Sequence, residues 1–489
     1  MIDLNIKLTT EPVFKYFEEI SKIPRCSGNE KAISDYLVAF AKSKNLEVEQ
    51  DDAQNVLIKK PATPGYEKTP TVILQGHMDM VCAKKKSVKH DFKKDPIELR
   101  VKGDMIYAKD TTLGADDGIA IAYALALLDL NTIPHPPLKV LMTTEEEVGL
   151  RGAAALDSKY LEGDMLINMD CEEEGILFSS CAGGIRAKHY ILAKWENSEK
   201  NRISYLISIG GLKGGHSGIE IDKGRGNSNK LMGRFLDDLL QEVEYCMSEI
   251  NGGVKMNAIP QETDVTVLID PCDENKLAAK VDEWNLIFKN ELKASDLGVT
   301  LSVKRLDNTT LKVLSRDAMK KVIALLVIMP NGVQTMSKDI EGLVESSTNL
   351  GVVTTFASDK GILFESAIRS NIKSLKYNIL NQARMIANIL DIGFETDSDY
   401  PEWEYSPDLE LRNIFKRVYR NIYNSEVKVT SVHGGLECGL FKERNKNLDM
   451  VAFGPNMYDV HTPNEHISIS SIERTWEYLL AVLREIRPA

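Results

Sequence analysis

The chain has 489 residues, of which 43% are hydrophobic and 27% are charged, as in ordinary soluble globular proteins. This length exceeds what one hydrophobic core usually supports, so we expect at least two domains. The net charge of −12 gives no overall electrostatic support for binding nucleic acid or an anionic membrane.

The N-terminal residues contain no basic region followed by an apolar core, so the sequence predicts no signal peptide. No run of about 18 apolar residues occurs anywhere, which also disfavours a transmembrane helix. The first regular element is a helix at residues 10–23, where Thr10 and Pro12 are typical of a helix start. A second helix is expected at residues 28–44.

The rest of the first 186 residues alternates strand and helix patterns. Short apolar runs predict buried strands, and a longer segment that is apolar on nearly every face predicts a buried helix. The expected strands span 71–76, 138–144 and 164–170, and the helix spans 116–130. Continuous apolar strands separated by helices predict an α/β domain with a mostly parallel sheet covered by helices on both faces.

After about residue 186 the pattern becomes that of an α+β domain, which we place at residues 187–400. Its expected elements are strands at 202–209 and 361–370, helices at 226–245 and 374–390, and a turn at 251–253. A hinge is expected at 397–407. Residues 401–489 then return to the first pattern, with helices at 409–423 and 470–486 and a strand at 450–454. We therefore expect residues 1–186 and 401–489 to form one domain, into which the second is inserted.

The seven cysteines are odd in number, scattered along the chain, and contain no CxxC pair. This pattern disfavours both a disulfide scaffold and a zinc–thiolate site. Reduced thiols in a cytoplasmic protein fit it best. The one basic run, at residues 84–94, is typical of a solvated loop and suggests no separate function.

Polar residues that can bind metal follow the predicted strands at their carboxyl ends. They are His77 and Asp79, the three glutamates 145–147, Asp170, and His461 after the last strand. In open α/β sheets the functional site lies at the carboxyl ends of the strands, so these residues should converge. Converging carboxylates stay ionised only beside a cation, which predicts a metal site.

Each motif alone has a more ordinary explanation. A lone His-x-Asp is usually structural, a glutamate triplet is usually a solvated surface, and Asp116 and Asp117 suit a helix N-terminus. Their equivalent positions on neighbouring strands favour metal instead. Histidine and carboxylate ligands suit zinc, with manganese or cobalt as alternatives. The carboxylates are too many for one tetrahedral ion, and two ions sharing a carboxylate fit the count.

The same motifs resemble those of the cocatalytic metallopeptidases related to carboxypeptidase G, aminoacylase and tripeptidase, and within them the aminoacyl-histidine dipeptidases. The matching stretches are GHMDMV (76–81), GADDGIA (114–120), TEEEVGLRGA (144–153), INMDCEEEG (167–175), GGHSGIEI (214–221), NAIP (257–260), HGGLECG (433–439) and GPNMYDVHTPNE (454–465). The resemblance covers essentially the whole chain. It implies a catalytic α/β domain with an inserted lid domain, a homodimer formed through the lid, and hydrolysis of Xaa-His and related dipeptides.

The resemblance also implies a ligand set for two divalent ions. His77 and Asp170 would bind one ion, Glu147 and His461 the other, and Asp116 would bridge them. The peptide bond that follows Asp116 is expected to be cis, as it tends to be in such sites.

Further roles follow from the same resemblance. Glu146 would be the general base, and Asp79 would hydrogen-bond the metal-binding ring of His77 and fix its tautomer. Glu145 is expected to be a spectator. Three residues of the lid would act on the substrate: His216 as an oxyanion donor, and Asn257 and Arg369 at the carboxylate side. Without the resemblance, the loop around His216 would be interpreted as flexible and solvated, and Asn257 and Arg369 as surface or strand-capping residues.

Other functions remain open on the sequence. A tripeptidase or an N-acyl-amino-acid amidohydrolase could use the same metal centre, although such relatives usually have shorter chains. A non-catalytic metal-binding scaffold would be expected to lack a ligand or the base, and all of these are present. A nucleotide-binding α/β protein would have a glycine-rich turn after its first strand, where this chain has GHMDMV.

Overall fold

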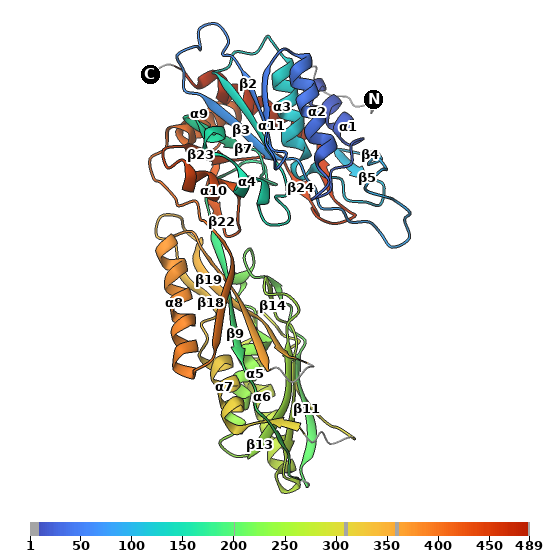
Figure 1. Ribbon diagram of the computed structural model, residues 1–489, viewed down its shortest axis with the longest axis vertical. Coiled ribbons are helices and arrows are strands. Elements are labelled where there is room, and N and C mark those ends of the chain that lie inside the picture. Colours follow the sequence, from blue (N-terminus) through green and yellow to red (C-terminus); the bar gives the residue numbers. More distant parts are fainter. Residues whose placement is uncertain (1–8, 200, 308–311, 357–360, 488–489) are drawn as a thin grey trace. The chain divides into compact units, whose positions relative to one another are not determined.

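The computed structural model describes residues 9–199, 201–307, 312–356 and 361–487 (Figure 1). Residues 1–8, for which the sequence predicts no signal peptide, lie outside these ranges. The chain forms two compact units: unit 1 contains residues 1–181, 405–431 and 436–489, and unit 2 contains residues 182–404 and 432–435. The first crossing therefore lies a few residues before the expected 186/187 boundary, because a strand that begins at Gly183 already pairs within unit 2.

Unit 1 is built on an eight-stranded sheet in the order β1-β2-β6-β3-β7-β23-β8-β22. The strands are β1 (Glu47–Gln50), β2 (Val56–Lys60), β3 (Val72–His77), β6 (Leu138–Thr143), β7 (Met165–Asn168), β8 (Ile176–Cys181), β22 (Lys428–Val432) and β23 (Asp449–Ala452). The central strands β6, β3, β7 and β23 are parallel neighbours. Strands β1, β2 and β8 pair antiparallel around them, so the sheet is mixed with a parallel centre. The predicted completion of this sheet by the C-terminal segment is confirmed by β23.

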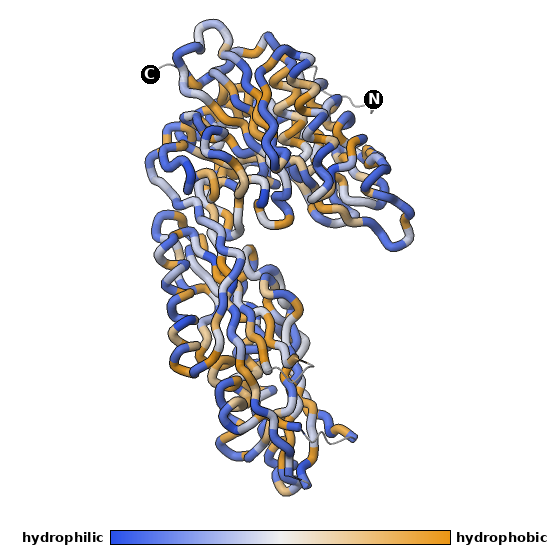
Figure 2. Tube along the Cα trace, in the orientation of Figure 1, coloured by the Kyte–Doolittle hydropathy of each residue, from blue (hydrophilic) through white to orange (hydrophobic). Residues whose placement is uncertain are grey.

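Helices cover this sheet and bury a large apolar core. The helices of unit 1 are α1 (Glu11–Ile20), α2 (Lys31–Ser43), α3 (Ala115–Asp129), α4 (Arg151–Ala155), η1 (Ser158–Leu161), α9 (Glu410–Tyr423), α10 (Glu437–Arg444) and α11 (Ile469–Glu485). Every residue of α3 from Ala115 to Leu128 is buried, which confirms the helix predicted from its all-round apolar pattern. Its apolar track is visible in Figure 2, and Tyr123 stacks on Trp476 of α11 at 5.8 Å.

A smaller four-stranded sheet completes unit 1. Its order is β24-β25-β5-β4, with β4 (Leu99–Lys102), β5 (Met105–Ala108), β24 (Met457–Tyr458) and β25 (His466–Ser468). Strands β24 and β25 pair antiparallel and enclose the loop 459–465, which carries His461. The pairing of β25 with β5 fixes this late loop against an early part of the chain.

Unit 2 contains a nine-stranded antiparallel sheet in the order β16-β11-β15-β13-β19-β20-β9-β21, with β18 also paired to β19. Its strands are β9 (Gly183–Ile191), β11 (Ile203–Gly210), β13 (Tyr245–Gly252), β15 (Thr263–Ile269), β16 (Thr300–Arg305), β18 (Gly332–Met336), β19 (Val344–Thr355), β20 (Ile362–Ser370) and β21 (Gly393–Tyr400). Two small ribbons accompany it, formed by β10 (Trp195–Asn197) with β17 (Lys312–Leu314), and by β12 (Gly215–His216) with β14 (Ala258–Ile259).

The helices of unit 2 are α5 (Ser228–Leu239), α6 (Glu274–Glu291), α7 (Arg316–Ile328) and α8 (Lys373–Leu390), with short turns η2 (Ile221–Lys223) and η3 (Pro271–Asp273). The helix predicted at 226–245 ends early, because the chain turns after Leu239 and Tyr245 already begins β13. The turn predicted at 251–253 was also misplaced, since Asn251 and Gly252 pair within β13 and only Gly253 leaves it, at φ +72°.

One prediction about the cysteines was wrong. Cys26 and Cys82 form a disulfide, with their Cα atoms 5.7 Å apart. The two residues are 56 positions apart in sequence, so no local spacing marked them as partners. An isolated β-bridge between the backbones of Cys26 and Met80 brings the loops that carry the two cysteines together. None of the helices in the described residues is long and apolar enough to cross a membrane.

Candidate metal centre

The predicted metal-binding residues lie at one edge of the unit 1 sheet, where the parallel strands end. His77 is the last residue of β3 and lies opposite Thr143, the last residue of β6. Asp170 follows the end of β7 by two residues. Because β6, β3 and β7 are adjacent and parallel, these ends meet at the same edge, as the sequence predicted.

The start of α3 brings Asp116 to this edge. The peptide bond between Asp116 and Asp117 is cis, as expected from the resemblance, and neither residue has helical backbone angles. Gly114 precedes them at φ +69°, where a Cβ would meet the side chains of Arg25 and Met80 at 2.6 Å. Glycine is therefore required at this turn.

Asp116 lies between the two histidines. Its Oδ1 is 3.0 Å from Nε2 of His77, and its Oδ2 is 3.1 Å from Nε2 of His461. On one side, His77 Nε2 is also 3.8 Å from Oδ1 of Asp170. On the other, His461 Nε2 is 2.7 Å from Oε1 of Glu147. One carboxylate thus connects two separate pairs of potential ligands.

These atoms form two groups in which every donor lies within 4.8 Å of the others. One group contains His77, Asp116 and Asp170, and the other contains Asp116, Glu147 and His461. Imidazole and carboxylate donors suit zinc and neighbouring divalent metals, and a shared carboxylate suits an ion pair. The donor set therefore fits two divalent cations. A third group also contains His77, here together with the carboxylates of Glu146 and Glu147.

The electrostatics of the cluster also fit a cation. Burial, and then the negative charge of Asp116, raises the pKa of Asp170 well above its usual range. Burial and nearby carboxylates raise the pKa of Glu146 from 4.5 to about 8. Although burial opposes it, hydrogen bonds from the two histidine rings lower the pKa of Asp116. Carboxyl groups that oppose one another's ionisation in this way are stabilised by bound positive charge.

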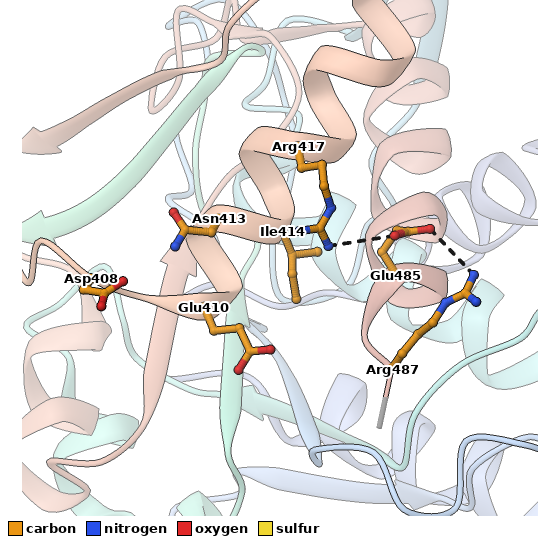
Figure 3. A pocket seen from close by; sticks show the side chains of 7 residues that line it. All are labelled: Asp408, Glu410, Asn413, Ile414, Arg417, Glu485 and Arg487. Atoms are coloured by element: carbon orange, nitrogen blue, oxygen red, sulfur yellow. Dashed lines mark ion pairs between the residues drawn. The ribbon is translucent and has the colours of Figure 1, made fainter. Parts of the chain in front are cut away.

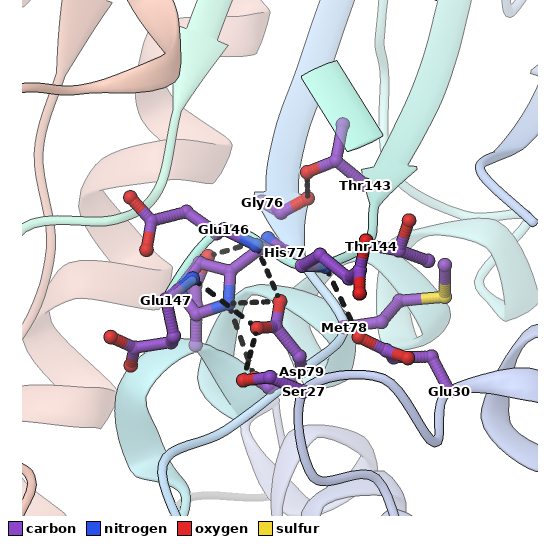
Figure 4. A network of polar contacts seen from close by, with 12 residues as sticks. Ser27, Glu30, Gly76, His77, Met78, Asp79, Thr143, Thr144, Glu146 and Glu147 are labelled. Carbon is purple, nitrogen blue, oxygen red and sulfur yellow. Dashed lines mark hydrogen bonds and ion pairs between the residues drawn. The ribbon is translucent and has the colours of Figure 1, made fainter. Parts of the chain in front are cut away.

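Asp79 holds several parts of the centre in place (Figure 4). Its Oδ1 is 3.3 Å from Nδ1 of His77 and accepts the backbone N–H of Glu146 at 3.0 Å. Its Oδ2 accepts the backbone N–H of Glu147 at 3.3 Å and the hydroxyl of Ser27 at 2.8 Å. The predicted contact between Asp79 and the His77 ring is present. The bonds to the glutamate segment were not predicted, and they make Asp79 a positioning residue for both.

Glu145, predicted to be a spectator, does not belong to any of the three donor groups in the described residues. Its backbone N–H donates to Oε1 of Glu30, and its side chain lies 3.6 Å from the guanidinium of Arg151. These contacts direct Glu145 away from the donor atoms and are consistent with its expected role.

The sequence did not single out several residues that support this centre. Arg25 is buried and donates to the backbone carbonyls of Met78, Asp79 and Gly114. Glu465 accepts the backbone N–H groups of residues 113, 114 and 115, and so fixes the turn before Asp116. Glu465 ends a stretch that carries the family resemblance, but its motif gives no hint of this contact.

In unit 2, two of the three predicted substrate-binding residues, His216 and Arg369, lie in one polar group with His433. The guanidinium of Arg369 helps, after burial, to lower the pKa values of both His216 and His433. Nε2 of His433 lies 2.7 Å from the hydroxyl of Ser347, which pairs with Arg369 across β19 and β20. His433 was not singled out in advance, although it begins the HGGLECG stretch.

The ring of His216 has a defined orientation. Its Nδ1 accepts the backbone N–H groups of Gly218 and Ile219 at 3.2 Å, so the neutral ring carries its proton on Nε2. Asn257 lies next to it, because Ala258 pairs with His216 between β12 and β14. The backbone carbonyl of Asn257 accepts from Ser217, while its side chain is exposed. The loop around His216 is thus ordered by its own hydrogen bonds.

A hollow of about 500 Å³ elsewhere in unit 1 does not resemble a catalytic site (Figure 3). Its lining residues come from the region of α9 and the end of α11: Asp408, Glu410, Asn413, Ile414, Arg417, Glu485 and Arg487. Glu485 lies 3.8 Å from both Arg417 and Arg487, so each of these charged side chains has a partner of opposite charge. None of the predicted site residues lines this hollow.

Comparisons with known proteins agree with this geometry. The model of a family described as peptidase family M20/M25/M40 matches residues 73–485. The chain is 38% identical over 482 residues to the cytosol non-specific dipeptidase of Escherichia coli, covering 98% of each protein. It is also 38% identical to a solved structure of aminoacylhistidine dipeptidase from Vibrio alginolyticus, with a TM-score of 0.92 and 99% of each chain covered. An aminopeptidase PepT structure from Bacillus cereus has a TM-score of 0.56 at 16% identity, with 98% of each chain covered, and so shares the fold.

Proposed function

The chain belongs to peptidase family M20/M25/M40, and from this we propose that it is a metal-dependent dipeptidase that hydrolyses Xaa-His and related dipeptides. The observation that carries the proposal is the position of Asp116, whose two carboxylate oxygens face the separate ligand pairs of His77 and His461. The two relatives that are 38% identical to this chain over almost its whole length are both named as dipeptidases, and one is named for aminoacylhistidine substrates.

We assign His77 and Asp170 to one divalent ion, Glu147 and His461 to the other, and Asp116 to both. When bound, the ions supply the positive charge that acidifies a water molecule and polarises the scissile carbonyl. The donor chemistry favours zinc, with manganese and cobalt as alternatives.

Glu146 is the proposed general base. Its backbone is fixed by Asp79, and its carboxylate belongs to a donor group with His77 and Glu147. From this position a carboxylate oxygen of Glu146 takes the proton of the attacking water and then passes it to the leaving amine.

For His216 we propose the oxyanion-donor role that the resemblance implies. A neutral ring with its proton on Nε2 can donate a hydrogen bond to developing negative charge. The hydrogen bonds from Gly218 and Ile219 favour this tautomer, and burial lowers the pKa of His216, which favours the neutral ring. Arg369 offers a guanidinium for the carboxylate of the substrate, and Asn257 is proposed to bind beside it.

We also propose that the protein is a cytoplasmic homodimer that associates through the lid formed by unit 2. The name of the Escherichia coli relative supports the location. Two side chains on the same face of α8, Met385 and Ile389, are 58% and 76% exposed and would become buried in such an interface. Light scattering on the purified protein would give the mass of a dimer, and the mass of a monomer would reject this part of the proposal.

The experiment that tests the function uses purified protein with added zinc or manganese, and a panel of dipeptides, tripeptides and N-acetyl amino acids. We expect hydrolysis confined to dipeptides, with efficient release of histidine from β-Ala-His. Hydrolysis of tripeptides or acylated amino acids instead would keep the metal centre and reject the dipeptidase assignment. Absence of hydrolysis with every metal would favour a non-catalytic scaffold.

A further inference from the structure

Glu437 is a fully buried carboxyl group close to the metal centre that the proposed mechanism does not use. It lies in the first turn of α10 and has 0% exposure. Its Oε2 accepts hydrogen bonds from the side-chain amide of Gln75 and from the hydroxyl of Thr143, the latter at 2.8 Å. Its Oε1 has no hydrogen-bond partner among the described residues. Burying a carboxyl group costs free energy unless it is hydrogen-bonded, and only one of the two oxygens of Glu437 is hydrogen-bonded here.

The two donors belong to neighbouring strands that end at the metal centre. Gln75 is in β3, two residues before His77, and Thr143 ends β6 directly opposite His77. Since side chains two positions apart on a strand share a face, Gln75 and His77 project from the same side of the sheet. Glu437 therefore joins the ends of β3 and β6 on the side from which His77 projects.

The network continues to a third strand. Oε1 of Gln75 accepts the side-chain amide of Asn168 in β7 at 2.6 Å. Oδ1 of Asn168 in turn accepts the backbone N–H of Asp170 at 3.3 Å. Gln75, Thr143 and Asn168 are all completely buried. The strands β3, β6 and β7 thus each carry one member of this network at or near the end.

We propose that Glu437 is a positioning residue for the metal centre, which through Gln75, Thr143 and Asn168 fixes the spacing of the three strand ends that present His77, the glutamate pair and Asp170. This inference rests on the proposed function for its catalytic consequence, although its effect on metal binding does not depend on the substrate. Hydrogen-bond partners of metal ligands typically contribute about 10- to 100-fold to metal affinity or activity, and Glu437 reaches the proposed ligand Asp170 through Gln75 and Asn168.

The hydrogen-bond pattern suggests a sharp comparison between two variants. Both donors bind Oε2, so a glutamine whose carbonyl oxygen takes that place keeps both bonds, and its amide occupies the position of Oε1. Burial raises the pKa of Glu437 from 4.5 to about 7, so a neutral side chain is compatible with this environment. Glu437→Ala removes the oxygen that accepts both bonds, and Thr143→Val removes one donor with little change of shape.

The experiment measures the zinc dissociation constant of the full-length protein by competition with a chelating dye, together with kcat, KM and the unfolding midpoint of the metal-free form. We expect Glu437→Ala to weaken zinc binding by about 10- to 100-fold. We also expect it to lower kcat by a larger factor than that by which KM changes. Thr143→Val should have a smaller effect in the same direction, which keeps the test valid if the alanine variant does not fold. Glu437→Gln should stay within about threefold of the parent protein.

Asp449→Ala is the matched control. Asp449 also accepts a hydrogen bond, from the backbone N–H of Leu411, but it begins β23 and so lies at the opposite edge of the sheet. Zinc affinity in this variant should equal that of the parent. Unchanged zinc affinity in Glu437→Ala and Thr143→Val, or an equal loss in Glu437→Gln and Glu437→Ala, would overturn the inference. If the parent hydrolyses no dipeptide, the proposed function fails while the zinc measurement still decides the role of Glu437.

Discussion

The backbone N–H of Glu146 donates a hydrogen bond of 3.0 Å to Oδ1 of Asp79, the same oxygen that faces the ring of His77. A single carboxylate therefore orients the proposed metal ligand His77 and fixes the segment that carries the proposed base. This arrangement explains why three consecutive glutamates can be placed at a strand end without all three facing one another. Glu146 and Glu147 are held toward His77 by Asp79, and Glu145 is held elsewhere by Glu30.

Replacing Asp79 with asparagine should impair both functions of this carboxylate. The variant loses at least one acceptor for the four groups that face Asp79, so we expect a loss of about 10- to 100-fold in zinc affinity and in kcat/KM. Chelator competition and steady-state kinetics measure the two effects. Ser27→Ala removes one of the same contacts and should cost much less. Parent-like values for Asp79→Asn would contradict the positioning role.

Replacing Glu146 with glutamine should separate catalysis from metal binding. The amide cannot take a proton from water, and general-base catalysis typically contributes about 10²- to 10⁴-fold, so kcat should fall by this amount. Metal content measured by mass spectrometry should remain at two ions per chain. Glu145→Gln is the neighbouring control and should keep nearly full activity. Full activity of Glu146→Gln would eliminate Glu146 as the base.

The bridging position of Asp116 predicts a difference in metal content between two variants. His461→Ala removes a ligand of one ion only, so we expect about one ion per chain to survive dialysis. Asp116→Ala removes the shared ligand and should lose both ions or bind them much more weakly. Elemental analysis after dialysis against metal-free buffer measures the number of metal ions bound per chain. Two retained ions in Asp116→Ala would contradict the shared site.

The tautomer of His216 predicts a catalytic effect without a change in metal content. Loss of one oxyanion donor typically lowers kcat by about 10²- to 10³-fold, and we expect this for His216→Ala. The two ions should be retained, because the ligands of both lie in unit 1. Steady-state kinetics and elemental analysis on the same preparation test this. A rise in KM with unchanged kcat would instead indicate that His216 only binds the substrate.

His433 predicts a pH dependence of stability. Burial, with the nearby positive charge of Arg369, lowers the pKa of His433 from 6.5 to about 3, so the folded ring stays neutral. Between these pKa values the unfolded chain binds more protons than the folded one, and the free energy of unfolding therefore falls as the pH falls below about 6.5. The limiting slope for one group is about 1.4 kcal/mol per pH unit.

Denaturant unfolding of the parent and of His433→Gln at pH 7.5 and 4.5 isolates this contribution. Other groups titrate in both proteins, so we compare the two losses of stability. The parent should lose about 2–3 kcal/mol more than the variant between these pH values. Equal losses would show that His433 titrates normally in the folded protein.

The sequence predicted which side chains would lie close together at the strand ends, because its signal was periodic and local. Apolar runs marked β3, β6 and β7, and the metal-binding side chains directly followed them, so the geometry of a parallel sheet brought His77 and Asp170 together. The family resemblance added the expectation that Asp116 bridges two ions and that His461 binds one of them. Glu147 and His461 are 314 residues apart, so the spacing of residues in the sequence could not show that their side chains are in contact.

The supporting residues could not be predicted, because their contacts also join distant parts of the chain. Glu465 is 352 residues from Leu113, and Glu437 is 362 residues from Gln75, so nothing in the local sequence of either marks its partner. The disulfide between Cys26 and Cys82 depends on a loop contact of the same kind. The end of α5 was misplaced because the apolar pattern continues past Leu239, where the chain turns toward β13.

The central claim is that two divalent ions, bound around Asp116, are required for dipeptide hydrolysis. The most direct test is to remove all metal with a chelator and then titrate zinc into the protein while measuring histidine release from β-Ala-His. We expect no activity without metal, and activity that reaches its maximum at two zinc ions per chain. Full activity after removal of the metal, or a maximum reached at one ion per chain, would contradict the claim.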